Sequence, residues 1–489
     1  MDIVLLLAQA APVTPIDALL GPAIDALSDA VFFTVPLFGL QVEGLVLMLA
    51  AAMVFFTAWL GLPQLRLFGH AVDVVRGRHA DKTAPGYTSH FAALSTALSG
   101  TVGLGNIAGV AIAITTGGPG AAFWMFVIGL FAMALKMAEV TLGLRYRIEG
   151  AKGEVFGGPM YTIARGFAAR PGLKTVGIVL GGCYAVAALG GALPMLQTNQ
   201  SFEQVAAVTG LREAFGDETA RWVYGVALAG AVAVVVLGSA RWLGAVTSRL
   251  VPLMCGVYLL AALAVLGANV AALPSALALI VSDAFSLQAA GGGALGAFVV
   301  GMRRAVYSCE AGVGSAVMAH TLARTREPAS EGAVALLEPF IDTVVICSMT
   351  ALVVVVSGAY QLEGLAGVGV TSAAFASVID WFPFVLAAAV FLFAYSTLIS
   401  WGYYGVQAWG YLFGRSTFSL WFYRVFYCVM IPLGAVLPLG KVVAFIDSCF
   451  FLMAVPNIIG LAVLARELKR EVAGYEARVL GRRAGRAIS

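Results

Sequence analysis

Two apolar segments of membrane-spanning length are each interrupted near the middle by glycines and polar residues. The first interruption runs from Thr101 to Gly109 (TVGLGNIAG), and the second runs from Ser308 to Ser315 (SCEAGVGS). Lipid offers no hydrogen bonds, so unwound backbone at membrane depth is stable only where protein buries it or where it lines a cavity. Paired interruptions in the two halves of a membrane protein are typical of a transporter's binding site.

The composition predicts an all-α polytopic membrane protein. Hydrophobic residues make up 61% of the chain and charged residues 11%, whereas soluble domains contain roughly 25% charged residues. About eleven segments are long enough to cross some 30 Å of hydrocarbon. They lie near residues 41–65, 91–115, 120–144, 175–208, 220–240, 243–266, 291–323, 333–358, 383–413, 416–438 and 440–464. The segments 267–287 and 365–381 are shorter or more polar, and we expect re-entrant or surface helices there.

The basic residues predict the orientation of the chain. Most lysines and arginines fall in connections on one side of the predicted spans, whereas only Arg212, Arg221 and Lys441 fall on the other side. Positive residues favour the cytoplasmic side, so we expect an external N-terminus and an internal C-terminus in a bacterial cytoplasmic (inner) membrane. The net charge of +3 is spread over these connections and a tail that can touch anionic lipid. A nucleic-acid partner is therefore not expected, and neither is a cleaved signal peptide.

The predicted spans after the first divide into two sets of five, and each set opens with an interrupted helix. An odd number of spans inverts the second set relative to the first, which predicts the five-plus-five inverted repeat of the LeuT type with one extra N-terminal span. The predicted parts are an external N-terminal segment (1–40), the extra helix (41–65), a cytoplasmic loop (66–90), the first repeat (91–266), an external connection (267–290), the inverted repeat (291–464) and a cytoplasmic basic tail (465–489).

Several motifs in order resemble the alanine or glycine:cation symporter family, from about residue 90 to 465. The matching stretches are Gly105–Ala111, Thr116–Met125, Gly157–Tyr161, Glu310–Ala316, Asp342–Thr343, Ser396–Thr397 and Pro456–Asn457. The resemblance implies that the protein is a symporter and not an enzyme. Such a symporter takes up a small neutral amino acid, most often alanine or glycine, together with sodium or protons. It implies no cofactor besides the coupling ion, and it leaves the oligomeric state open.

The first interruption has the chemistry to hold both ends of an amino acid. The free N–H groups of Leu104, Gly105 and Asn106 carry partial positive charge, and the carbonyls from Ser99 to Val102 carry partial negative charge. Thr101 and Gly103 lie between them, and we expect glycine there for close ligand approach and for torsions that side chains oppose. Helix packing through small residues is the alternative.

The second interruption supplies an aromatic wall, a hydroxyl and a carboxyl. By resemblance, the carbonyl of Tyr307 and the hydroxyl of Ser308 would face the substrate ammonium, and the size of Cys309 would matter to the ligand. Glu310 near the bilayer midplane either carries a coupling proton or caps its own broken helix.

A sodium ion needs several oxygen ligands. By resemblance, Ser396 and Thr397 would bind sodium together with the carbonyls of Phe393, Ser99 and Val102. The alternative is that both hydroxyls bond only their own helix.

Two further residues are candidates for the substrate cavity. Gln197 matches a family position whose amide reaches the cavity, although it would serve equally for packing across helices. Trp401, one turn beyond Thr397, either closes the cavity or anchors its helix at the interface.

Other polar groups are predicted to be structural: Lys136 and Glu139 to neutralise each other, and His320 to be a satisfied or surface histidine. An ion channel and an intramembrane hydrolase built on Ser315 and His320 are the alternative classes of function. Two unlike interruptions in one chain favour a single occluded site over a channel filter, and no acidic residue that would orient His320 is obvious nearby. The chain also departs from the family pattern around the cavity, at Tyr307, Cys309, Val317, Pro194 and Val406, so the substrate is open.

Overall fold

The computed structural model describes residues 15–37, 40–150, 154–286, 293–365, 367–378, 380–437 and 440–481, and the chain in them is almost entirely helical. The all-α prediction is therefore confirmed, with two short antiparallel hairpins, β1–β2 and β3–β4, as additions. Parts of the predicted N-terminal segment, external connection and tail lie outside the described residues.

The N-terminal region is less regular than the predicted single span. Its elements are α2 (Pro15–Val31), β1 (Thr34–Leu37), β2 (Leu40–Glu43), α3 (Gly44–Trp59), α4 (Pro63–Arg66) and α5 (Phe68–Val75). Helix α3 has 16 residues and is therefore about 24 Å long, shorter than the roughly 20 residues that cross a bilayer. The helix lies inside the predicted segment 41–65 and is shorter than it, because the hairpin and a turn replace both ends of that segment.

The first set of predicted spans opens with an interrupted helix. Its elements are α6 (His90–Thr101), the π-helical η1 (Gly105–Gly109), α7 (Val110–Gly117), α8 (Gly120–Arg145), β3 (Ile148–Glu149), β4 (Val155–Phe156), α9 (Pro159–Ala168), α10 (Lys174–Gly191), α11 (Met195–Thr209), α12 (Leu211–Phe215), α13 (Asp217–Val236) and α14 (Ala240–Ala268). The chain bends by 56° between α6 and the helix that follows, so the first predicted interruption is confirmed.

The second set also contains its predicted interruption, between α16 and α17. Its elements, from the connection onward, are η2 (Val270–Ala272), α15 (Leu273–Ala284), α16 (Gly293–Cys309), α17 (Val317–His320), α18 (Pro328–Ala335), α19 (Leu337–Pro339), the π-helical η3 (Phe340–Cys347), α20 (Ser348–Val356), η4 (Ala359–Gln361), α21 (Val368–Ala376), α22 (Phe382–Phe413), α23 (Thr417–Val436), α24 (Gly440–Leu452) and α25 (Ala454–Leu480). The expected tail begins inside α25, which continues to Leu480.

Within the described residues, eight helical segments are long and apolar enough to cross a membrane, or nine when the bent pair counts as one span. This agrees with a polytopic protein but gives fewer spans than the eleven expected. The difference lies in α3 and in α16, which ends after 17 residues at the second interruption.

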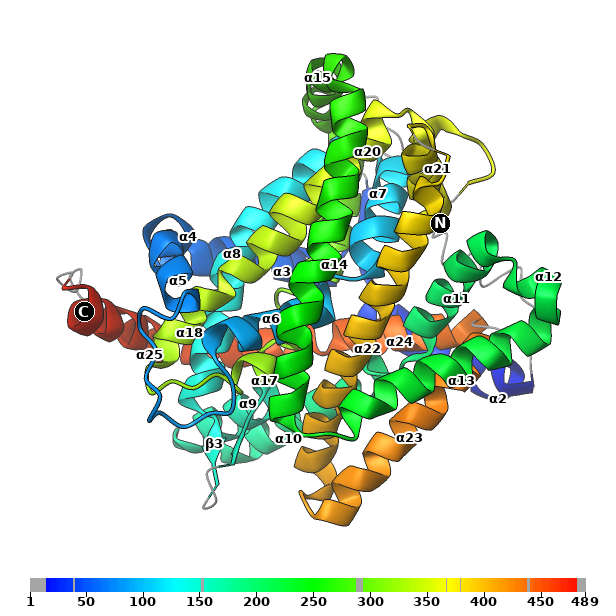
Figure 1. The fold of residues 1–489 in the computed structure, drawn as a ribbon. Helices are drawn as coiled ribbons and strands as arrows, with labels where there is room; N and C mark the ends of the chain where they lie inside the picture. Colours follow the sequence, from blue (N-terminus) through cyan, green and yellow to red (C-terminus); the bar gives the residue numbers. More distant parts are fainter. Residues whose placement is uncertain are drawn as a thin grey trace.

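The interrupted helices lie in the middle of the molecule (Figure 1). Helix α6 packs against α14 and α22, and α16 packs against α8. A second apolar core joins α13 and α23, which lie side by side, to α11 and α22. The main core surrounds both interruptions and includes Val102, Ile107, Val313 and Ala316.

Candidate functional site

The first interruption is closed by the side chain of Asn106. Its Oδ1 accepts a hydrogen bond from the Gly103 N–H at 2.9 Å, and its own N–H donates to the Gly103 carbonyl at 3.2 Å. Neither Gly103 nor Gly105 has a positive φ. The expectation of special torsions there is therefore wrong, because a side chain rather than an unusual backbone conformation shapes this turn.

The two interruptions meet through a buried polar cluster. The Asn106 amide nitrogen donates to Ser308 Oγ at 3.0 Å and to Asp342 Oδ1 at 2.6 Å, and Ser308 Oγ donates to Asp342 Oδ2 at 2.6 Å. A Cβ built on Gly105 would lie 3.7 Å from Ser308 Cα. The predicted juxtaposition of the two interruptions is thus present.

Asp342 is the residue of this cluster that the sequence interpretation did not include among site residues. It is fully buried in η3 and also accepts from Thr343 Oγ1 at 2.7 Å. A buried carboxylate is stable only when it is hydrogen-bonded or paired, and π-helical segments are frequent at functional sites. The sequence signal that could have identified Asp342 is an aspartate within an apolar run.

Backbone torsions form the second interruption. Glu310, Gly312 and Gly314 have φ values of +54°, +91° and +82°. A Cβ on Gly314 would lie 2.6 Å from Pro159 Cγ, so both the torsion and the packing require glycine. Asn457 on α25 donates to the Gly312 carbonyl at 2.9 Å.

Glu310 bonds within its own interruption. Its carboxylate accepts a hydrogen bond from Ser315 Oγ, and the residue is 4% exposed. Cys309, directly before it, is fully buried and ends α16.

The residues expected to hold sodium come together between α6 and α22. Ser99 Oγ donates to the Ser396 carbonyl at 2.6 Å, and Ser396 Oγ bonds the carbonyls of Ser99 at 3.3 Å and Phe393 at 2.9 Å. Val102 is fully buried at the end of α6.

Thr397 differs from its neighbours because its hydroxyl is unused. Among the described residues, nothing hydrogen-bonds its buried Oγ1. This atom lies 3.0 Å from the point that a Cβ on Gly103 would occupy. The hydroxyl therefore points at the first interruption.

The remaining substrate candidates divide into two groups. The Tyr307 hydroxyl donates to Asp447 Oδ1 at 2.9 Å, and the ring centroids of Tyr307 and Trp401 lie 5.2 and 5.9 Å from that of Phe450. The Tyr307 ring also adjoins the first interruption, since its Cδ1 lies 3.7 Å from the point that a Cβ on Gly105 would occupy. Gln197 is half-buried on α11, and no hydrogen bond within the described part of the chain links it to the Asn106 cluster.

Three further residues of the first interruption have different surroundings. Thr101 is buried and its hydroxyl donates to the Ala97 carbonyl of its own helix at 3.4 Å. Leu104 and Gly105 remain half-buried, so surface is accessible beside the turn.

A chain of buried charges runs past the second interruption. Lys136 Nζ lies 3.0 Å from Glu338 Oε1, and Glu139 Oε1 instead accepts from Asn457 at 2.8 Å. The lysine therefore makes its ion pair with another helix rather than with Glu139, although the charges of Lys136 and Glu139 still attract each other.

His320 extends this chain. Its Nδ1 lies 2.6 Å from Glu331 Oε1 and its Nε2 3.5 Å from Glu338 Oε2, and Glu331 also contacts His90. The histidine is thus buried rather than at the surface: its Nδ1 is hydrogen-bonded, whereas its Nε2 faces Glu338 without a hydrogen bond among the described residues. Because Ser315 bonds Glu310 and His320 contacts these glutamates, the two do not form a hydrolase pair.

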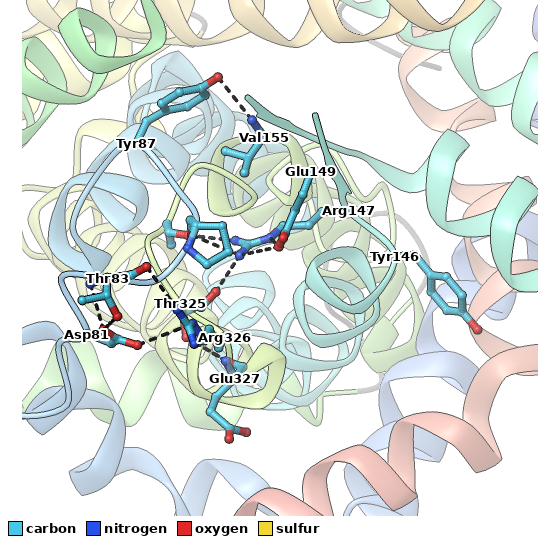
Figure 2. A network of polar contacts seen from close by, with 12 residues as sticks. Asp81, Thr83, Tyr87, Tyr146, Arg147, Glu149, Val155, Thr325, Arg326 and Glu327 are labelled. Carbon is cyan, nitrogen blue, oxygen red and sulfur yellow. Dashed lines mark hydrogen bonds and ion pairs between the residues drawn. The ribbon is translucent and has the colours of Figure 1, made fainter. Parts of the chain in front are cut away.

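A polar network fastens the loops at one end of both interrupted helices (Figure 2). The buried Arg147 guanidinium donates to the carbonyls of Ala323 at 2.9 Å, Pro85 at 3.1 Å and Thr325 at 2.5 Å. Tyr87 adds a bond from the Val155 N–H at 3.2 Å. The loop before α6, the loop after α17 and the β3–β4 hairpin are therefore held together.

Comparisons with known proteins agree with this arrangement. The sequence profile of the sodium:alanine symporter family matches residues 31–486. The chain is 36% identical over 437 residues to a sodium/alanine symporter, AgcS, of Methanococcus maripaludis, covering 88% of this chain and 93% of the relative. It is 32% identical over 427 residues to a probable sodium/glutamine symporter, GlnT, of Bacillus subtilis, covering 86% and 85%.

A solved structure, MhsT in complex with L-phenylalanine, matches with a TM-score of 0.49 and 15% identity over 80% of this chain and 90% of that chain; this similarity is too low to support a conclusion. The profile match over nearly the whole chain and the coverage of the sequence relatives establish the family. The chain belongs to the sodium:alanine symporter family, and it is a membrane transporter rather than an enzyme.

Proposed function

We propose that this protein imports a small neutral amino acid, alanine or glycine first, together with sodium, by alternating access. We place it in the bacterial cytoplasmic membrane with the N-terminus outside and the C-terminus inside. Family membership supports cation-coupled amino-acid transport, and the unused hydroxyl of Thr397 beside the first interruption is the observation that carries sodium as the cation.

Sodium binds between α6 and α22 in this proposal. A buried hydroxyl without a partner is unfavourable, and a hard cation that takes oxygen ligands would satisfy it. The Ser396 hydroxyl and the carbonyls of Ser99, Val102 and Phe393 complete a set of neutral oxygens that fits this ion. When bound, sodium supplies positive charge at the end of α6 and orders the turn that begins at Gly103.

The amino acid binds beside the first interruption. Its carboxylate meets the N–H groups near Leu104 and Gly105, at the positive end of the following half-helix. Its ammonium group lies toward the Tyr307 carbonyl. The accessible surface at Gly105 and its short distance to Ser308 support a substrate with a small side chain. The Ser308 hydroxyl is bonded to Asn106 and Asp342 and orients these two residues.

Alternating access requires the loops at one end of the interrupted helices to separate. The Arg147 network joins the loops next to α6 and α17, so it has to open when that end admits or releases substrate. Arg147 donates to three backbone carbonyls and lies near Glu149, at 3.2 Å. It therefore stabilises the closed arrangement of this end.

The experiment is uptake of radiolabelled alanine into proteoliposomes with an inward sodium gradient or an equal choline gradient, at matched pH. Unlabelled glycine, alanine, glutamine and phenylalanine serve as competitors. Sodium-dependent uptake that alanine and glycine suppress is the expected result. Sodium-dependent uptake suppressed by glutamine alone would refute the substrate assignment and leave the coupling ion intact.

Proton coupling is the second candidate, and the buried chain of charges favours it. The charged groups Lys136, Glu338, His320 and Glu331 form a series of contacts that ends at His90, at the start of α6. The charge of Lys136 also acts on Glu310 and Glu139, and Asn457 links Glu139 to the Gly312 carbonyl. If a proton gradient alone drives uptake and Glu310→Gln abolishes it, this candidate replaces sodium coupling.

A further inference from the structure

A surface hollow of about 650 Å³ lies beside the C-terminal half of α25, the helix that ends near the C label in Figure 1. Arginines dominate its lining, which consists of Arg145, Arg170, Ala462, Val463, Arg466, Glu467, Arg470, Glu471 and Arg478. Five arginines and two glutamates give the lining an excess of three positive charges, and Glu327 compensates one of them by pairing with Arg478 at 2.7 Å. The volume is in the range of small-molecule sites.

The two glutamates are already engaged. Glu467 accepts from the Tyr146 hydroxyl at 2.8 Å and from Arg170 at 3.3 Å, and it also pairs with Arg145. Glu471 lies 2.6 Å from Arg145. These contacts hold Arg145, at the end of α8, and Arg170, after α9, as one wall of the hollow. Because Glu467 and Glu471 pair with these two arginines, their carboxylates are not available to the opposite wall.

Arg466 and Arg470 form that opposite wall. Both are exposed, and no ion pair to either appears among the described residues. They are four residues apart on one helix, so their side chains are neighbours and repel each other. An anion between them would remove this repulsion.

The same face of α25 is apolar one to two turns earlier. Ile459 and Val463 are 39% and 37% exposed, and with Arg466 and Arg470 they follow the spacing i, i+4, i+7, i+11 of a single helical stripe. The stripe changes from aliphatic to cationic along the helix. This sequence of surfaces matches an amphiphile, with acyl chains at one end and an anionic head at the other.

We propose that this hollow binds the phosphate of an anionic phospholipid, whose acyl chains lie along Ile459 and Val463. Guanidinium groups bind phosphate oxygens in bidentate geometry, and basic pockets between helices at a membrane surface hold anionic head groups. A soluble phosphate would use the arginines but would leave the aliphatic part of the stripe uncovered. The lipid is therefore the better match.

The test measures lipid binding to the purified full-length protein in an uncharged detergent, by native mass spectrometry and by a tryptophan-fluorescence titration. The probes are phosphatidylglycerol, phosphatidylcholine and inorganic phosphate. The Arg466→Gln/Arg470→Gln double variant removes the two exposed arginines. The matched control is Arg76→Gln/Arg249→Gln, which removes the same charge from two exposed positions outside the hollow.

We expect the wild type and the control to bind phosphatidylglycerol equally and in preference to phosphatidylcholine. The double variant should bind it roughly 25-fold more weakly, because each arginine near an anionic lipid contributes about five-fold. Equal binding by the double variant would overturn the proposal. Binding of inorganic phosphate as tight as that of the lipid would also overturn it, in favour of a soluble anion.

Discussion

The two interruptions have the same glycine pattern but are held by different forces. The first is a turn without left-handed torsions, closed by the hydrogen bond that the Gly103 N–H donates to Asn106 Oδ1. The second depends on left-handed backbone at Glu310, Gly312 and Gly314. A Gly-x-Gly pattern in a membrane segment therefore indicates a break, but it does not tell which residue stabilises that break.

The difference also separates their roles. The second interruption is packed against Pro159 and bonded by Asn457, with its glycines buried. The first keeps accessible surface at Gly105, next to an unused buried hydroxyl. We infer that the second interruption is the rigid side of the site and the first is the side that ligands complete.

The largest expected effect is from Gly314→Ala. A left-handed torsion and a contact at 2.6 Å with Pro159 together should destabilise the fold by about 2–5 kcal/mol. Fluorescence-detected gel filtration and a melting curve in detergent would measure this. A variant as stable as the wild type would show that the left-handed backbone at Gly314 does not stabilise the second interruption.

Asn106→Ala should come next. It leaves the Gly103 N–H without its side-chain acceptor and removes the donor to Asp342 Oδ1, while Ser308 and Thr343 still donate to Asp342 Oδ2. A buried group left unsatisfied costs about 1–3 kcal/mol. We expect alanine uptake to fall by at least about ten-fold. Asn269→Ala, the same change at a half-buried helix end, is the control and should retain uptake; equal losses in both would contradict a specific role for Asn106.

Gly105→Ala separates folding from binding. The added Cβ would touch Ser308 and Tyr307 at ordinary distances of 3.7 Å, so the melting temperature should stay near that of the wild type. The methyl group would occupy the proposed place of the substrate. Overpacking there costs about 1–3 kcal/mol, and about 1.4 kcal/mol corresponds to a ten-fold change in affinity. We therefore expect the KM for alanine to rise by about 10- to 100-fold.

Gly109→Ala provides the comparison for this variant, because no atom lies within 4 Å of its Cβ position. It should leave the KM unchanged. An unchanged KM in Gly105→Ala as well would place the substrate elsewhere.

Thr397→Val tests the cation. Without sodium the variant should be as stable as the wild type or more so, since an unsatisfied buried hydroxyl is removed. With sodium, the wild type gains stability by linkage, and the half-maximal sodium concentration should rise about ten-fold in the variant. Thr397→Ser should behave like the wild type. Equal sodium-dependent melting shifts in all three proteins would exclude Thr397 as a ligand.

The smallest effect is expected from Tyr307→Phe. The hydroxyl bonds Asp447 rather than facing the first interruption, so its loss should change stability by only about 0.5–1.5 kcal/mol. Alanine KM should change less than about three-fold. A larger change would mean that this hydroxyl contacts the substrate.

Local patterns carried most of the fold prediction. Apolar length located the long helices, such as α8 and α22, and glycines located both interruptions. The patterns did not reveal that α3 is short, because the residues before it also form an apolar stretch that pairs as a hairpin. Helix α25 extends past the predicted span because Glu467 and Glu471 pair with Arg145 on α8, and Glu467 also pairs with Arg170 in the loop after α9. No local pattern encodes these contacts.

The site was predictable in its glycines and hydroxyls but not in its long-range partners. Ser99 and Ser396 meet as expected, whereas Asp342 and Asp447 were missed because their importance depends on residues far away in the chain. Lys136 was paired with Glu139 from helical spacing, although Glu338 is its partner across the helix interface. Spacing identifies neighbours within a helix and gives no information on neighbours between helices.

The central claim is that a cation completes the first interruption and so allows the amino acid to bind. The most direct measurement is equilibrium binding of radiolabelled alanine to the detergent-purified protein in sodium chloride and in choline chloride of equal concentration. The account predicts saturable binding in sodium and little or none in choline. Equal binding in both salts would contradict it.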